Sequence, residues 1–315
     1  MIPPGEFDLI HWIKAHTESP RDCMTTLGIG DDCAILQPTP GAELVVTTDM
    51  LMDGRHFVLS EHGPEAVGRK AMSVNLSDIA AMAAIPQAAF VAVALPRKDG
   101  RANEIARGLH AGIAEIAGRF SVTLAGGDTN AWDGPLVICI TLIGQTPAGS
   151  SAVRRSGAKV GDIVFVTGPL GGSILGRHLR PEPRITEALA LRGAAAIHAL
   201  IDISDGLASD LGHILEESGN LGAVLDFDAI PIHEDAWKRS RQTGRTALDH
   251  ALSDGEDFEL CVVLNPEDAE RIERHPPSPA RLFRVGRIDE GHGLRIKARD
   301  GRDEVVEVSG FDHFC

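Results

Sequence analysis

Hydrophobic residues along this chain of 315 residues follow two different periods. Some stretches are apolar at every second position or continuously, which is typical of strands, and others are apolar at helical spacing. The first kind predicts strands at 43–48, 88–95, 122–124, 136–143, 162–166, 222–227, 258–264, 281–288 and 294–298. Because these strands alternate with predicted helices, the pattern favours an α/β fold.

The clearest helical pattern lies at 102–120, where Ile105, Leu109 and Ile113 recur on one face and mark a buried stripe. Further helices are predicted at 64–84, at 205–217 and directly after Asn265, whose side chain can cap the next turn.

One segment divides these elements into two groups. Residues 144–161 are rich in small, polar and turn-forming side chains, as inter-domain connections often are. We therefore predict a two-domain α/β (α+β) protein with domains at 1–148 and 149–315.

Composition narrows the possible functions. A hydrophobic content of 43% is enough for a substantial core, and a formal net charge of −15 argues against nucleic acid or an anionic membrane as a partner. The five cysteines include no C-x-x-C pair, so neither a disulfide framework nor a structural zinc site is indicated. With no apolar stretch long enough to cross a bilayer, we expect a soluble, cytoplasmic protein.

Short acidic motifs are the main chemical signal of the chain. There are six of them: GIGDD (28–32), TTD (47–49), NLSD (75–78), GGDT (126–129), DISDG (202–206) and DGEDFE (254–259). Gathered carboxylates repel one another unless a cation joins them, and such hard oxygen ligands suit Mg²⁺ better than zinc or copper. The motifs therefore predict an enzyme that handles phosphate groups.

Two motifs are expected at strand ends, where ligands commonly sit in α/β sheets. TTD follows the apolar run 44–46, and GGDT follows the predicted strand 122–124, where two glycines allow close approach of the backbone to an anion. The alternative for TTD is a solvated turn, and the alternative for GGDT is a plain tight turn, which would need only one of its two glycines.

Other motifs have structural alternatives too. Asn75 and Asp78 share a helix face beside apolar residues, where a carboxylate needs a partner unless it lies on the helix margin. Asp205 can be a helix cap, but capping does not explain Asp202. Asp257 and Glu259 can belong to a solvated edge of the sheet. No G-x-x-x-x-G-K-[ST] phosphate loop and no G-x-S-x-G motif occur in the chain.

In their order along the chain, the motifs resemble thiamine-monophosphate kinase, a member of the superfamily that includes aminoimidazole ribonucleotide synthetase and selenophosphate synthetase. The resemblance runs nearly from end to end. It rests on GEF (5–7), GIGDDCA (28–34), TTD, KAMSVNLSDIAAM (70–82), GGDT, RSGAKVGD (155–162), IDISDGLASDLGHI (201–214), GEDFEL (255–260) and GFDHF (310–314).

The resemblance implies a role for individual residues. The implied ligands of several Mg²⁺ ions are Asp32, Thr47, Thr48, Asp49, Asp78, Asp128, Asp202 and Asp205. The implied nucleotide contacts are Gly127, Asp128, Arg155 and Ser204. The implied contacts to thiamine phosphate are His56, Glu256 and Phe311. The resemblance further implies that the sheet of the N-terminal domain, which would bind ATP and Mg²⁺, pairs with its twin in a homodimer.

The implied reaction is ATP-dependent phosphorylation of thiamine monophosphate to thiamine diphosphate by direct in-line transfer. The second pKa of a phosphate monoester is about 6, so the acceptor is already ionised at neutral pH and we expect no catalytic base. The alternative within the superfamily is a cyclisation like that of aminoimidazole ribonucleotide synthetase. A third hypothesis is a non-enzymatic, acidic protein that binds divalent ions.

Overall fold

The computed structural model describes residues 6–17, 24–98, 100–298 and 302–306. The chain forms two compact units: the first holds residues 1–79 and 85–151, and the second holds residues 80–84 and 152–315. Across the described residues, no helix is both long enough and apolar enough to cross a lipid bilayer.

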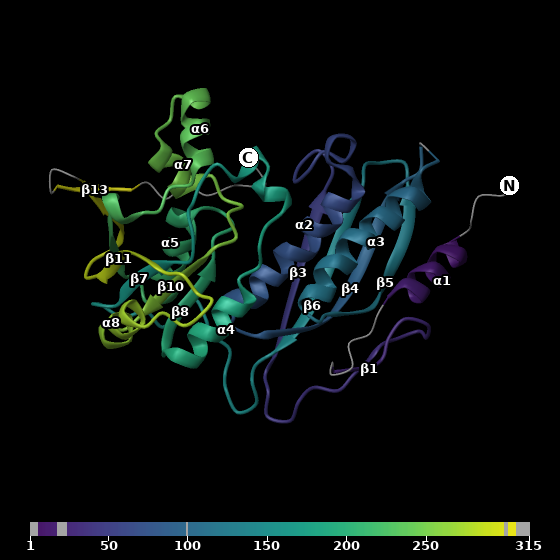
Figure 1. Cartoon of the computed structure of the whole chain (residues 1–315), viewed down its shortest axis with the longest axis horizontal. Helices are drawn as coiled ribbons and strands as arrows, with labels where there is room; N and C mark the ends of the chain where they lie inside the picture. Colours follow the sequence, from purple (N-terminus) through teal and green to yellow (C-terminus); the bar gives the residue numbers. More distant parts are fainter. Residues whose placement is uncertain (1–5, 18–23, 99, 299–301, 307–315) are drawn as a thin grey trace. The chain divides into compact units, whose positions relative to one another are not determined.

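A four-stranded sheet forms the centre of the first unit. Its strands lie in the order β3 (Leu44–Met52), β6 (Val137–Gln145), β4 (Ile85–Pro96) and β5 (Thr123–Trp132). The β4 and β5 strands are parallel, and the other neighbours are antiparallel. Helices α2 (Leu59–Ala81) and α3 (Ala102–Arg119) run side by side over one face of this sheet (Figure 1).

Strand alternation matches the covering of one face by the described helices. In β6, Ile138, Ile140 and Leu142 are fully buried, whereas the residues between them are only partly buried. The covering helices α2 and α3 approach each other closely at Gly112 of α3. A Cβ at this position would lie 2.0 Å from the carbonyl oxygen of Glu65 in α2. The first unit also contains α1 (Glu6–His16) and the short strands β1 (Thr25–Leu27) and β2 (Ile35–Leu36).

The edge strand β3 exposes a row of apolar side chains, which we call the β3 stripe. It consists of Leu44, Val46, Met50 and Met52, with exposed fractions of 51%, 60%, 57% and 40%. Between them, Val45 and Leu51 are buried on the other face of the strand. The period of two therefore gives β3 one face in the core and one apolar face at the surface.

A seven-stranded mixed sheet forms the centre of the second unit. Its strands lie in the order β13 (Asp303–Val305), β12 (Gly293–Lys297), β9 (Gly222–Asp226), β11 (Phe283–Asp289), β7 (Ile163–Val166), β10 (Leu260–Leu264) and β8 (Ile197–Asp202). All residues of β7 and β10 are buried. Helix α5 (Leu207–Glu217) packs its apolar stripe into a core cluster with residues of these strands.

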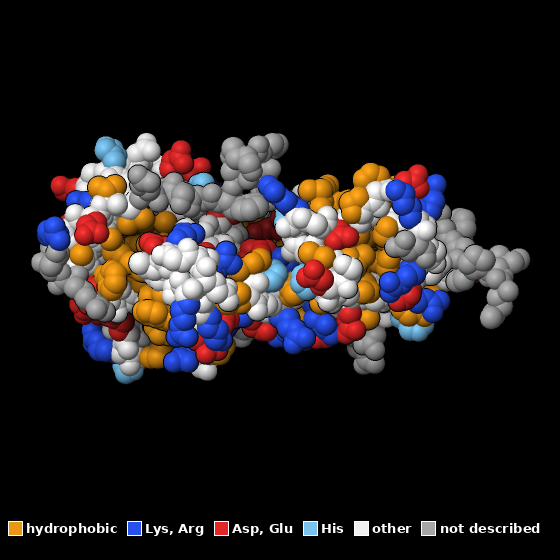
Figure 2. Space-filling view, turned by 90° about the horizontal axis from the view of Figure 1, so that it is seen from above, with side chains coloured by type: hydrophobic (Ala, Val, Ile, Leu, Met, Phe, Trp, Pro, Cys, Tyr) orange, Lys and Arg blue, Asp and Glu red, His pale blue; other side chains and the backbone are white. Residues whose placement is uncertain are grey.

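The remaining helices of the second unit connect its strands. They are α4 (Ile185–Ala194), α6 (Glu234–Thr243), α7 (Ala247–Ser253) and α8 (Pro266–Arg274), with short 3₁₀ helices at Ser173–Leu175, Arg177–Leu179 and Phe227–Ala229. Asn265 caps α8 as predicted, because its side chain accepts a hydrogen bond of 2.9 Å from the backbone N–H of Asp268. Figure 2 shows basic and acidic side chains close together on this face, with hydrophobic side chains reaching the surface among them.

The structure corrects several predicted elements. The helices α1, α4, α6 and α7 and the strands β1, β2, β8 and β13 were missed. The strand predicted at 43–48 continues to Met52, and the helix predicted at 64–84 ends at Ala81. The helix predicted from 205 begins at Leu207, with Gly206 rather than Asp205 at its N-cap position. In β3 and β8, hydrogen bonding to a neighbouring strand carries the element through polar residues that interrupt the apolar run.

Candidate active site

Two carboxylates face each other in the first unit. The hydroxyl of Thr47 in β3 donates a hydrogen bond to the carboxylate of Asp78 in α2, which places both beside Asp49. Burial, and secondly the negative charge of Asp78, raise the pKa of Asp49 to about 6. A partly buried pair of carboxylates is costly without a cation, so this is the arrangement expected of a divalent-ion site.

The two threonines of the TTD motif lie on opposite faces of β3. Thr48 is exposed, and its hydroxyl lies 3.1 Å from that of Thr141 and 3.4 Å from the sulfur of Cys139, both in β6. The structure therefore brings Thr47 together with Asp49 and Asp78, but it does not bring the side chain of Thr48 to them.

TTD and GGDT lie inside strands, so the prediction that they follow strand ends was wrong. Pairing of β3 with β6 continues past Asp49 to Met52, and pairing of β5 with β4 continues past Asp128 to Trp132. Glycine is required inside β5, since a Cβ at Gly127 would lie 2.0 Å from the carbonyl oxygen of Val91. The glycines thus serve close packing of two strands rather than a turn.

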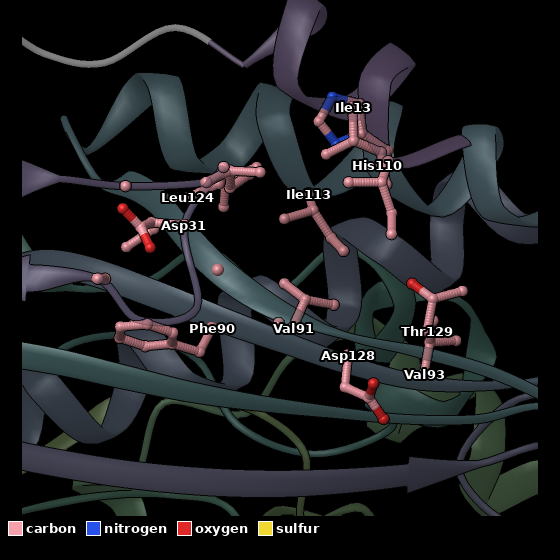
Figure 3. Close-up of a pocket in the computed structure, with 18 of the residues that line it drawn as sticks. Ile13, Asp31, Phe90, Val91, Val93, His110, Ile113, Leu124, Asp128 and Thr129 are labelled. Carbon is pink, nitrogen blue, oxygen red and sulfur yellow. The ribbon is translucent and has the colours of Figure 1, made fainter. Parts of the chain in front are cut away.

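A pocket with a volume of about 670 Å³ lies in the first unit. It is lined by the loop 28–34, by α1 and α3, and by β4 and β5. Figure 3 shows Phe90 and Val91 on one side of the pocket and Ile113 and His110 on another. Most of the lining is apolar, but Asp32 and Asp128 also contribute to it. An apolar pocket with a few carboxylates at its wall can hold a flat base beside a metal-bound phosphate chain.

His110 is a residue of this pocket that the sequence analysis missed. The residue is only 8% exposed, and its ring packs edge-on against Trp12 with ring centroids 5.3 Å apart. Burial lowers the pKa of His110, while a hydrogen bond to the backbone of His16 acts in the opposite direction. Because this hydrogen bond raises the pKa of His110, it favours the charged ring, and the imidazole N–H is therefore the donor to the backbone of His16. Within the described residues, the buried Nε2 has no hydrogen-bond partner, which makes it an acceptor in the neutral ring.

A second acidic cluster lies in the second unit, where β8 leads into α5. Asp202 is the last residue of β8 and is 6% exposed, and Ser204 and Asp205 follow it. The backbone N–H of Asp205 donates to the carboxylate of Asp210 over 3.1 Å. Burial, followed by the charge of Asp202, raises the pKa of Asp210 to about 8. Asp210 is therefore a further member of this cluster that the motif analysis did not select.

The DGEDFE motif is not a solvated edge. The carboxylates of Asp257 and Glu259 are 0% and 6% exposed and form ion pairs with Arg177 and Arg184. Glu256, which directly precedes Asp257, is half-buried. The solvated-edge alternative for Asp257 and Glu259 is therefore wrong.

The remaining predicted residues are placed as follows. His56 is half-buried, and its Nδ1 accepts a hydrogen bond of 3.0 Å from the N–H of Met52, so a neutral ring carries its proton on Nε2. Lys70, in the KAMSVNLSDIAAM motif, is fully buried and donates to the carbonyl of His56 over 2.8 Å. Arg155 is exposed. Phe311 lies outside the described residues.

No group of three or more His, Cys, Asp or Glu side chains is arranged to hold a metal ion in the described part of the chain. Mg²⁺ sites in phosphate-handling enzymes commonly use one or two carboxylates together with waters and substrate phosphates. The Asp49 and Asp78 pair fits that kind of site better than a site made by protein ligands alone.

Domain comparisons agree with this architecture. The AIR synthase related protein N-terminal domain matches residues 30–146, and the AIR synthase related protein C-terminal domain matches residues 148–299. The fold and the acidic site thus define an AIR synthase related protein. The predicted two-domain α/β fold is confirmed.

Individual proteins similar to this chain identify its family among the AIR synthase related proteins. The chain is 43% identical over 294 residues to the thiamine-monophosphate kinase of Rhodopirellula baltica, covering 91% of each sequence. The thiamine-monophosphate kinase structure from Stenotrophomonas maltophilia matches with a TM-score of 0.78 and 34% identity, over 96% of this chain and 98% of that one. A structure of AaThiL complexed with AMPPCP and TMP matches with a TM-score of 0.75 and 31% identity, over 98% and 97%.

The chain belongs to the thiamine-monophosphate kinase family. It is therefore an enzyme of the phosphotransferase class, as the resemblance implied.

Proposed function

We propose that this chain transfers the γ-phosphoryl group of ATP to thiamine monophosphate and releases thiamine diphosphate and ADP. An oxygen of the substrate phosphate forms the new bond to phosphorus in line with the leaving group, and the bond from phosphorus to the β,γ-bridging oxygen breaks. The observation that carries the proposal is the likeness, over 98% of the chain, to AaThiL complexed with AMPPCP and TMP. The acceptor oxygen is already ionised, so no residue is assigned as a base.

Magnesium is the cation that the carboxylates best suit. We assign its ligands to Asp32, Thr47, Asp49, Asp78 and Asp128 of the first unit and to Asp202 and Asp205 of the second. Thr48 joins this set only through its backbone oxygen, because its side chain lies on the other face of β3. The raised pKa of Asp49 supports this assignment, because it reflects burial of the carboxylate and, secondly, the negative charge of Asp78, and a bound cation would offset both. When bound, Mg²⁺ neutralises phosphate charge that the few basic residues of the motifs cannot. The carboxylates themselves position the phosphates and take up no proton.

The pocket of the first unit is assigned to the adenosine of ATP. Its apolar walls suit a purine base, and Gly127 and Asp128 belong to its lining. The buried Nε2 of His110 is an acceptor that suits the exocyclic amine of adenine. We assign Arg155 and Ser204 as further nucleotide contacts, on the basis of the family motifs.

Thiamine phosphate is assigned to a different set of residues. His56, with its Nε2 hydrogen as a donor, suits a phosphate oxygen, and the half-buried carboxylate of Glu256 suits a cationic or N–H-bearing part of the substrate. Phe311 completes the assignment on the basis of the family motif alone.

The two domains and the assembly are part of the proposal. Domain 1–148 binds ATP and Mg²⁺ and forms a homodimer, and domain 149–315 contributes the second acidic cluster. The β3 stripe supports the dimer, because a row of exposed apolar side chains on an edge strand commonly marks a protein interface. We place the enzyme in the cytoplasm, where ATP is available to a kinase.

The test is incubation of the protein with ATP, Mg²⁺ and thiamine monophosphate. We expect ADP and thiamine diphosphate in equal amounts by chromatography, and neither product in excess EDTA. Orthophosphate release that requires a purine-pathway substrate would support cyclisation instead. Binding of Mg²⁺ without binding of ATP in calorimetry would support the non-enzymatic hypothesis.

A further inference from the structure

The loop that carries Glu256 has an unusual backbone conformation. Glu256 and Phe258 have φ values of 52° and 53°, in the left-handed region that residues with a Cβ seldom adopt. Two such residues on either side of Asp257 are unfavourable unless the surroundings hold them in place, and conformations of this kind cluster where ligands bind. The loop therefore depends on contacts with neighbouring segments to keep this conformation.

Asp257 is the first anchor. Its carboxylate is fully enclosed, and it accepts hydrogen bonds from the backbone N–H of Gly171 over 2.7 Å and from the guanidinium of Arg177 over 2.9 Å. The same guanidinium donates to the carbonyl of Gly171 over 2.9 Å. One side chain thus ties the middle of the loop to the connection that follows β7.

Glu259 is the second anchor. Its carboxylate is held by two nitrogens of Arg184, at 2.8 and 2.5 Å, and by the hydroxyl of Thr167 at 2.6 Å. That hydroxyl in turn accepts the backbone N–H of Leu260 over 2.8 Å. A bidentate guanidinium pair is a strong and directional contact, so the end of the loop is fixed in orientation.

The backbone of the loop is bound to the acidic loop after β8. The N–H of Glu256 donates to the carbonyl of Ser204 over 2.7 Å, and the N–H of Phe258 donates to the carbonyl of Ile203 over 2.8 Å. The N–H of Ile203 donates to the carbonyl of Glu259 over 2.7 Å. The segment with Ser204 and the segment with Glu256 are therefore joined by three backbone hydrogen bonds.

We propose that Asp257 and its partner Arg177 are positioning residues, which hold the loop in its left-handed conformation so that the carboxylate of Glu256 meets thiamine phosphate. This inference rests on the proposed function. Asp257 itself touches no substrate, because its side chain is enclosed by protein. Glu259 and Arg184 hold the end of the same loop, whereas Asp257 and Arg177 hold its middle.

The test compares four enzymes in steady-state assays: the wild type, Asp257→Asn, Glu256→Ala and the double variant. Each single change is expected to raise the KM for thiamine phosphate about tenfold, while the KM for ATP stays within about twofold. If Asp257 acts through Glu256, the double variant has the KM of Glu256→Ala alone. A purely structural role predicts instead that the two effects multiply, or that both KM values change together.

Two further variants keep the test decisive. Arg177→Met removes the partner of Asp257 from the other side and is expected to reproduce the KM change if Asp257→Asn fails to fold. Arg274→Met removes an exposed ion pair with Glu270 and is expected to leave both KM values unchanged. An inactive wild type would overturn the proposed function and this inference together. An active wild type with normal KM values in Asp257→Asn and Arg177→Met would overturn this inference alone.

Discussion

Replacing Asp78 with Asn is expected to stabilise the metal-free protein and to abolish its activity. Asn keeps an oxygen that accepts the hydrogen bond from Thr47, but it removes the charge that faces Asp49. The substitution therefore separates the effect of the carboxylate pair on stability from its proposed role in binding Mg²⁺.

The size of the effect follows from the pKa of Asp49. Its rise from 3.8 to about 6 corresponds to about 3 kcal/mol, at about 1.36 kcal/mol for each pH unit. Burial is the larger cause, so the charge of Asp78 accounts for about 1 kcal/mol of this amount. For a domain of this size, 1 kcal/mol shifts the Tm by roughly 2–4 °C.

The assay is thermal unfolding at pH 7.5, in EDTA and then in Mg²⁺ with ATP, together with ADP release. In EDTA, we expect Asp78→Asn to have the higher Tm. In Mg²⁺ with ATP, we expect the wild type to gain stability through binding and the variant to gain little. Asp133→Asn, which removes an exposed carboxylate, is the matched control and is expected to match the wild type throughout. A lower Tm of Asp78→Asn in EDTA, or normal turnover at saturating Mg²⁺, would refute the reasoning.

Three further predictions concern other features. His110→Phe removes the acceptor in the pocket, so its KM for ATP is expected to rise about tenfold while that for inosine triphosphate changes little; equal changes for both nucleotides in steady-state assays would contradict base recognition by this residue. Burial raises the pKa of Asp257 to about 7, above its unfolded value. In urea titrations, the stability of the wild type relative to Asp257→Asn is therefore expected to be highest below about pH 4 and to fall as the pH rises through about 7. An increase in relative stability over that range would contradict the assignment. Val46→Asp places a charge in the β3 stripe and is expected to convert a dimer to a monomer in light scattering, whereas a monomeric wild type would rule out the dimer.

Local patterns predicted the elements that depend on local interactions. The helix predicted at 102–120 is α3 at Ala102–Arg119, because its apolar stripe and its length are visible in the sequence. The cap at Asn265 was also predicted correctly. Helix α6 was missed, because it is polar almost throughout and only Ala236 of its residues is buried.

Features that depend on distant partners could not be predicted. The buried state of Asp257 and Glu259 depends on Arg177 and Arg184, which lie 80 and 75 residues away along the chain. Nothing near the DGEDFE motif indicates these partners, so an acidic segment looks solvated. His110 offered a weak signal, since it shares the buried face of its helix with Ala106 and Ile113, but only the structure places its ring in a pocket.

The alternation of β3 has an evolutionary consequence. Thr47 and Asp49 face α2, whereas Val46 and Met50 on the same strand face outward. A substitution at any one of these positions alters a single face, but insertion or deletion of one residue inside the strand exchanges both faces at once. Such a change would remove the carboxylate from its partner and bury the apolar row in the same mutational step. We therefore expect sequences that descend from a common ancestor with this chain to vary in the side chains of β3 and to keep its length.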